Sequence, residues 1–197
     1  MTEKDIQLFS DRAEAVHASV ARVSSMEEAY KYAVDLCAEK EERKPFPGCP
    51  KDLSNKPGKI IAAPTLSDDQ FASLKGLADA KDFKLIKNNM RSYLGGVDIG
   101  FTFADYGIID TGTIVLNCPN EELRLATMVS EAHIAVLPVA KIVADAYDIE
   151  DILTGWMKKA DYTAFITGPS RTADVERVLT VGAHGPLYLH ILLLEEV

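Results

Sequence analysis

The chain has 197 residues, with 21 Lys and Arg against 30 Asp and Glu and a formal net charge of -9 at pH 7. This length predicts one domain with a sizeable core. The negative charge argues against non-specific binding to nucleic acid or an anionic membrane surface, so an anionic ligand would need a locally positive site. The amino-terminal MTEKDIQLFSDR has no apolar signal region, and the longest apolar run, near LYLHILLL, is too short for a membrane span. We therefore expect a cytoplasmic protein.

The first 57 residues predict an amino-terminal helical segment that packs on, or leads into, the rest of the domain. Helices are expected over residues 3–19 and 25–41, with a short strand at 21–24 between them. The following stretch, Lys44–Gly58, holds four of the nine prolines of the chain. Such a stretch is long for an irregular loop inside a compact domain. It is either a lid, a partner-contacting loop or a plain surface excursion.

From residue 58 to residue 197, short buried strands alternate with helices. Strands are predicted at 59–64, 97–103, 113–116, 133–138, 162–167 and 187–194, and helices at 68–80, 121–129, 139–146, 149–160 and directly after the turn at 168–171. This alternation predicts an α/β sandwich built around a largely parallel sheet.

The segment Tyr162–Leu179 is the most informative part of the chain. It contains an apolar strand, a Gly-Pro-Ser-Arg turn and a helix-forming run. The N–H groups at a helix amino terminus favour an anion, and Arg171 would add a forked cation to the same site. The spacing matches neither a Walker loop nor a dinucleotide fingerprint. The alternative is structural: Ser170 or Thr172 caps the helix, and Arg171 pairs with a surface carboxylate.

A second polar turn, Asp110–Thr113, lies between two apolar runs. Gly112 permits a sharp turn, while Asp110 offers an acceptor beside the hydroxyls of Thr111 and Thr113. Alternatively, Asp110 only bonds the backbone of its own turn. This turn and those at 168–172 and 182–185 would meet at one edge of the sheet if the preceding strands run parallel.

The histidines and cysteines give weaker signals. His133 lies near the start of a predicted strand, and His184 lies between two glycines; each is either a structural hydrogen-bonding group or an acid/base. The three cysteines, Cys37, Cys49 and Cys118, are too widely spaced for a disulfide framework or a Cys-x-x-Cys ligand set. No metal site and no intrinsic cofactor are expected, and Cys118 is predicted to be a buried, inert thiol.

Four segments together resemble the LUD-domain family over roughly residues 58–197: GVDIGFTFADYGIIDTGTIVL, HIAVLP, FITGPSRTADVE and GAHGPLYLHILLL. The resemblance implies a three-layer α/β/α sandwich similar to the NagB/RpiA/CoA-transferase-like fold. It also implies a non-cluster subunit of a bacterial system of three proteins that oxidises lactate to pyruvate, with the iron–sulfur clusters on partner subunits. CoA transferases of this fold use a glutamate nucleophile, for which this sequence identifies no equivalent.

The family motif positions carried onto this chain are Asp110, Thr111, Gly112, Thr113, Gly168, Pro169, Ser170, Arg171, Thr172, Asp174, Glu176, His184 and Gly185. We expect a lactate-oxidation subunit that binds a small anionic ligand at the Thr111–Thr113 and Ser170–Thr172 turns, with Arg171 holding the anion. One alternative is a stand-alone enzyme acting on a phosphosugar, nucleotide or acyl-CoA, with His184 or Asp110 as base. The other is a ligand-free scaffold that assembles partner subunits.

Overall fold

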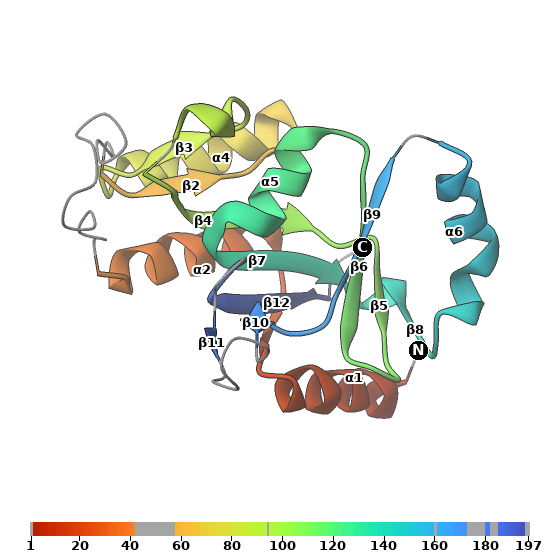
Figure 1. Cartoon of the computed structure of the whole chain (residues 1–197). Helices are drawn as coiled ribbons and strands as arrows, with labels where there is room; N and C mark the ends of the chain where they lie inside the picture. Colours follow the sequence, from red (N-terminus) through yellow and green to blue (C-terminus); the bar gives the residue numbers. More distant parts are fainter. Residues whose placement is uncertain are drawn as a thin grey trace.

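The computed structural model describes residues 2–41, 58–93, 95–159, 161–172, 180–181 and 185–195. Its centre is a six-stranded sheet with the order β1-β12-β7-β4-β2-β3, in which every neighbouring pair is parallel (Figure 1). The strands are β1 (Ser19–Val23), β2 (Ile60–Ala62), β3 (Lys84–Ile86), β4 (Val97–Phe103), β7 (Ser130–Pro138) and β12 (Tyr188–Leu194). The predicted α/β fold with a parallel sheet is confirmed.

Helices cover both faces of this sheet (Figure 1). One face, which we call the α2 face, packs against α2 (Met26–Glu39) and α4 (Asp68–Asp79). The other, the α1 face, packs against α1 (Glu3–Ala15) and α5 (Glu121–Val129). Because neighbouring residues of a strand point to opposite faces, Ile134 joins the core under α2 while Ala135 joins the core under α1. Burial on both faces explains the unbroken apolar runs of the central strands.

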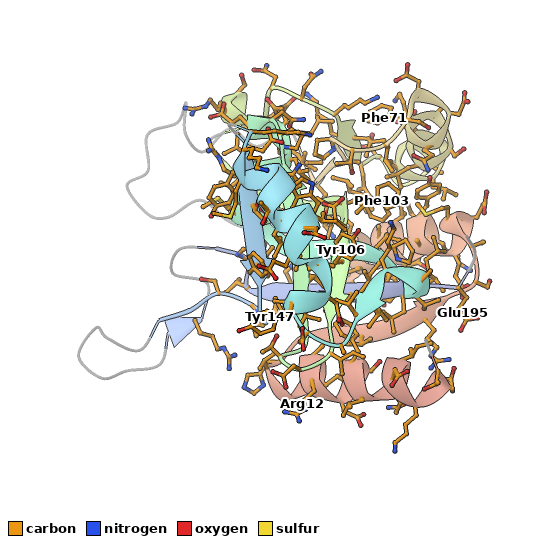
Figure 2. The ribbon with its side chains drawn as sticks, turned by 90° about the vertical axis from the view of Figure 1, so that its right-hand side faces the viewer. Arg12, Phe71, Phe103, Tyr106, Tyr147 and Glu195 are labelled. Carbon is orange, nitrogen blue, oxygen red and sulfur yellow. The ribbon has the colours of Figure 1, made fainter. Side chains whose placement is uncertain are left out.

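The sequence did not predict a second, four-stranded sheet with the order β8-β5-β6-β9. Its strands are β5 (Tyr106–Ile108), β6 (Thr113–Cys118), β8 (Ile142–Val143) and β9 (Tyr162–Ile166). The chain enters it directly from the carboxyl ends of β4 and β7, so this sheet occupies the end of the parallel sheet where ligands usually bind (Figure 1). Helix α6 (Glu150–Met157) covers its outer side, where the Trp156 ring lies 6.2 Å from the Tyr106 ring (Figure 2).

One predicted helix is wrong. Residues 139–146 form a short 3-10 turn, η2 (Val139–Lys141), followed by β8, because the backbone of Ile142 and Val143 pairs with β5. A second 3-10 turn, η3 (Tyr147–Ile149), leads into α6. Directly after the Gly168 turn, the chain forms β10 (Arg171–Thr172), which pairs antiparallel with β11 (Thr180–Val181). The helix predicted after this turn falls mostly on the residues between these two strands. Residues 173–179 lie outside the described part.

The predicted helices at 68–80 and 121–129 are confirmed as α4 and α5, and each begins at a side-chain cap. Ser67 and Gln70 form a reciprocal cap at the start of α4, and the Asn120 side chain accepts from the Leu123 N–H at the start of α5. One further 3-10 turn, η1 (Met90–Ser92), was not predicted. The division of the chain at residue 57 stays a prediction; β1, which precedes it, pairs along its whole length with β12.

Candidate functional site

Three threonine hydroxyls join two of the predicted ligand-binding turns. The Oγ1 atoms of Thr111 and Thr113 lie 2.6 Å apart, and those of Thr113 and Thr167 lie 2.7 Å apart. The strands that carry them, β6 and β9, are antiparallel neighbours in the second sheet. The expected parallel arrangement is therefore absent here, but antiparallel pairing brings the 110–113 and 167–170 turns together all the same.

On one side of this contact lies a cavity of about 380 Å³, which we call the threonine pocket. Its lining includes Asp110, Thr111, Thr113, Asp145 and Tyr147, and among the described residues that line it there is no Lys or Arg. Tyr147 is 83% exposed and lies at the foot of α6 (Figure 2). Two carboxylates and no cation make this pocket unsuited to an anion.

On the other side lies a cavity of about 290 Å³, which we call the His133 pocket. The predicted ligand residues Gly168, Ser170 and Gly185 line it, together with His133 and Thr127. The Ser170 N–H donates to the Pro186 carbonyl oxygen over 3.0 Å, which holds the 168–170 turn against the segment before β12. Thr167 lines both pockets, so the two predicted turns border adjoining cavities instead of one.

His133 lines this pocket but is not one of the predicted ligand-binding residues. It is 1% exposed, and its Nε2 lies 2.8 Å from the Thr102 Oγ1 on β4. Burial, with a smaller effect from the charge of His190, lowers the pKa of His133 to about 3, so the imidazole is neutral at pH 7. A neutral imidazole offers one N–H donor and one acceptor. The signal in the sequence was a polar residue within the otherwise apolar strand HIAVLP. Its partner in the register of β4 is Gly100, and Thr102 lies two residues further along that strand.

Arg171 lies elsewhere than predicted. Its Nη2 donates to the Val16 carbonyl oxygen over 3.1 Å, at the carboxyl end of α1. A cation there complements the negative end of the helix dipole. Arg171 itself lies in β10, and the helix predicted after it falls on residues outside the described part, so its place at a helix amino terminus stays a prediction. In the described part of the chain, this side chain lines neither pocket. The guanidinium has four further N–H groups that can bind a ligand, so the role of Arg171 in ligand binding stays a prediction.

Both turn glycines allow close approach to α1. Gly112 has φ 61°, and a Cβ on it would lie 2.4 Å from the Ala13 backbone nitrogen. Gly168 has φ 72°, and its Cβ would lie 2.1 Å from the Val16 carbonyl oxygen. Only glycine fits such a conformation and such contacts without displacement of the helix. The amino-terminal helix thus supports both predicted turns.

The sequence matches the LUD-domain family over residues 6–194. The chain belongs to this family. Lactate utilization protein C of Shouchella clausii is 37% identical over 94 residues, which make up 46% of this chain and 41% of that protein. Lactate utilization protein C of Geobacillus sp. is 36% identical over 100 residues, 48% and 41% of the two chains. The matched part is therefore less than half of each relative.

A solved structure of a DUF162-family protein from Deinococcus radiodurans has the same fold. Its TM-score is 0.62 over 98% of this chain and 97% of that one, at 15% identity. At this level of identity the likeness concerns the fold alone. It supports the two-sheet architecture on which the pockets are built.

The remaining predicted positions of this LUD-domain chain contribute less. Asp174, Glu176 and His184 lie outside the described residues, and of Thr172 only the backbone, in β10, is described. Cys37 and Cys118 are buried. In the described ranges no group of three or more His, Cys, Asp or Glu residues is arranged to hold a metal ion. Nor does that part of the chain contain a helix that is long and apolar enough to cross a membrane.

Proposed function

We propose that this chain serves a bacterial lactate utilization system, in which it binds a small carboxylate in the His133 pocket and assembles with iron–sulfur partner subunits. The observation that carries the proposal is the match to several proteins named lactate utilization protein C, with 36–37% identity for two of them. The three widely spaced cysteines of the sequence leave the electron carriers to partner proteins.

The His133 pocket suits a small, partly apolar acid better than the threonine pocket does. Its described lining carries no acidic side chain, whereas two aspartates line the threonine pocket. Ser170 and the neutral His133 are two of the groups that can form a hydrogen bond to a carboxylate or hydroxyl, and Leu189 and Ala164 give apolar walls for a methyl group. The size of the cavity, about 290 Å³, fits a ligand with few atoms.

Reconstitution tests the role in the system. The purified chain is mixed with the two iron–sulfur lactate-utilization subunits from the same organism, and lactate oxidation is followed with an electron-accepting dye. We expect turnover only when all components are present. Full activity of the iron–sulfur subunits without this chain, or turnover by this chain alone, would overturn the proposal.

Calorimetric titration with L-lactate and pyruvate tests the ligand site. Ser170→Ala removes one hydrogen bond to a charged ligand, so we expect about tenfold weaker binding. Ser73→Ala is the matched control, because Ser73 is an exposed serine on α4 that bonds only the Asp69 carbonyl oxygen of its own helix. Equal weakening by both substitutions, or unchanged binding to Ser170→Ala, would exclude this pocket as the site.

A further inference from the structure

A larger cavity of about 570 Å³, which we call the Lys40 pocket, lies on the α2 face at the amino ends of β7 and β12. Its lining includes Leu36, Lys40, Glu131, Ala132, Tyr188 and His190. The sheet separates it from the His133 pocket, because His133 pairs with Leu189 while His190 pairs with Ile134, and neighbouring residues of a strand face opposite ways. The Lys40 pocket is therefore independent of the proposed lactate site.

Lys40 is held in this pocket from two directions. Its Nζ lies 2.6 Å from the Glu131 Oε1, and the two side chains are only 9% and 13% exposed. The Lys59 ammonium donates to the carbonyl oxygens of Cys37, Ala38 and Lys40, which fixes the end of α2 that carries Lys40. The positions of the ammonium and the carboxylate are thus set before any ligand arrives.

Two further groups complete the pocket. The His190 Nδ1 lies 2.9 Å from the Tyr32 hydroxyl, so its orientation is set and its Nε2 remains for a ligand. Burial, and then the charge of Lys40, lowers the pKa of His190 to about 4, which keeps the ring neutral at pH 7. The Tyr188 ring, 53% exposed, lies 4.8 Å from the Lys40 ammonium and forms an aromatic wall.

The arrangement of charges selects the ligand. Among the described residues, the carboxylates of Glu39, Glu41 and Glu131 line the pocket and repel a simple anion such as lactate. The nearly buried Lys40 ammonium and Glu131 carboxylate lie side by side, so a simple cation would find an opposite charge in only one of these two groups. A molecule that carries both charges pairs with both groups, and it adds no net charge to a site where an uncompensated charge is costly.

We propose that the Lys40 pocket binds an amino acid in its zwitterionic form. The ligand carboxylate accepts from the Lys40 ammonium, and the ligand ammonium donates to the Glu131 carboxylate. The His190 Nε2 bonds the ligand backbone, and the side chain lies against Tyr188 and Leu36. The volume of the cavity leaves room for a large side chain.

Three molecules with the same phenyl group test the charge requirement by calorimetry on the whole chain: L-phenylalanine, L-3-phenyllactate and 2-phenylethylamine. They present a zwitterion, an anion and a cation. We expect L-phenylalanine to bind at least tenfold tighter than the other two. Equal or tighter binding of phenyllactate or phenylethylamine would overturn the proposal, and so would the failure of every standard proteinogenic amino acid to raise the melting temperature.

Variants and spectroscopy locate the site. Lys40→Met and Glu131→Gln should each weaken L-phenylalanine binding at least tenfold, whereas Lys31→Met, an exposed lysine on the same helix, should not. Since loss of a nearly buried ion-pair partner can prevent folding, the His190 ring signals are also followed by NMR in the wild-type chain. They should shift on addition of L-phenylalanine, and unchanged His190 signals at saturation would contradict the assignment. Ser170→Ala, which tests the lactate site, should leave this binding unaffected.

Discussion

Thr113 and Thr167 place their hydroxyl oxygens 2.7 Å apart, so one contact ties the start of β6 to the residue that follows β9. Thr113 is 4% exposed, and its hydroxyl also meets that of Thr111 at 2.6 Å. The wall that separates the threonine pocket from the His133 pocket therefore depends on three hydrogen-bonded threonine hydroxyls. Hydroxyls suit this place because each one both donates and accepts.

Thr113→Val should destabilise the protein by roughly 1–3 kcal/mol, because a side chain of the same shape loses two hydrogen bonds and leaves two hydroxyls without their partner. Denaturant unfolding measures this. Thr163→Val on β9 is the matched control, since within the described part of the chain the Thr163 side chain makes no hydrogen bond. Equal stability of the two variants would contradict the role given to the three threonine hydroxyls.

Gly112→Ala should destabilise the protein by about 1–3 kcal/mol, because alanine would have to adopt the left-handed backbone conformation of this residue. Displacement of α1 adds to this, because the new Cβ would lie 2.4 Å from the Ala13 nitrogen. Gly155→Ala in α6 is the control: nothing lies within 4 Å of its Cβ position, and alanine favours the helix by up to about 1 kcal/mol. The melting temperatures should therefore move in opposite directions. A neutral Gly112→Ala would show that α1 does not pack on this turn in solution.

Much of the parallel sheet could be predicted because its strands are apolar on both faces and its helices carry clear caps. The helix predicted at 121–129 begins at the Asn120 cap and matches α5 residue for residue. Such signals are local, so one sequence is sufficient to read them. The alternation of β4, β7 and β12 with helices then fixes the fold class.

Two strands of the second sheet, β6 and β9, were predicted as strands, but their pairing into a separate sheet was not. The reason is that β5 and β8 are short, and that β8 and β9 pair with strands far earlier in the sequence. β8 has two residues, and its hydrogen bonds go to β5, about 35 residues earlier. The contacts of Arg171 could not be predicted for a related reason. A Gly-Pro-Ser-Arg turn before a helix-forming run suggests an anion as the partner of Arg171, whereas in the structure its backbone pairs with Val181 and its side chain donates to the Val16 carbonyl oxygen. Neither partner is visible from the residues around Arg171.

Arg171→Ala should change the free energy of unfolding by less than about 1 kcal/mol, because its hydrogen bond to the Val16 carbonyl oxygen is exposed to solvent. The anion-binding role predicts in addition that lactate binding weakens by roughly 1.5–3 kcal/mol. A denaturant melt and a calorimetric titration separate the two effects. Arg12→Ala, a change on the exposed side of α1, controls for the loss of positive charge. If Arg171→Ala bound lactate as tightly as wild type, Arg171 would have no role in anion binding and would only contact α1.

Cys118 should resist alkylation in the native protein. Burial, and then the nearby charge of Asp105, raises the pKa of its thiol to about 11, so the reactive thiolate is scarce at pH 8. Iodoacetamide treatment followed by peptide mass spectrometry should therefore label Cys118 only after denaturation. Rapid labelling of the native protein, at a rate near that of a free thiol, would show that β6 opens locally or that the thiol is not buried.

Acid should destabilise the protein through its two buried histidines. His133 and His190 have folded-state pKa values of about 3 and 4, against an ordinary value of 6.5. The unfolded chain therefore binds more protons at pH values between 6.5 and about 4, and stability falls as the pH decreases through that window. Between pH 7.5 and 5.5 the free energy of unfolding should fall by about 1 kcal/mol for each histidine, because pH 5.5 lies one unit below the ordinary pKa of 6.5.

Denaturant unfolding at these two pH values measures the effect in wild type and in two variants. His190→Gln and His133→Gln remove one titrating group each, so each variant should lose less stability on acidification than wild type, whatever its stability at pH 7.5. The comparison uses only the difference between the two pH values, so a general cost of substitution cancels. Wild-type stability that is unchanged or higher at pH 5.5, or variants as acid-sensitive as wild type, would show that these rings are not neutral and buried in solution.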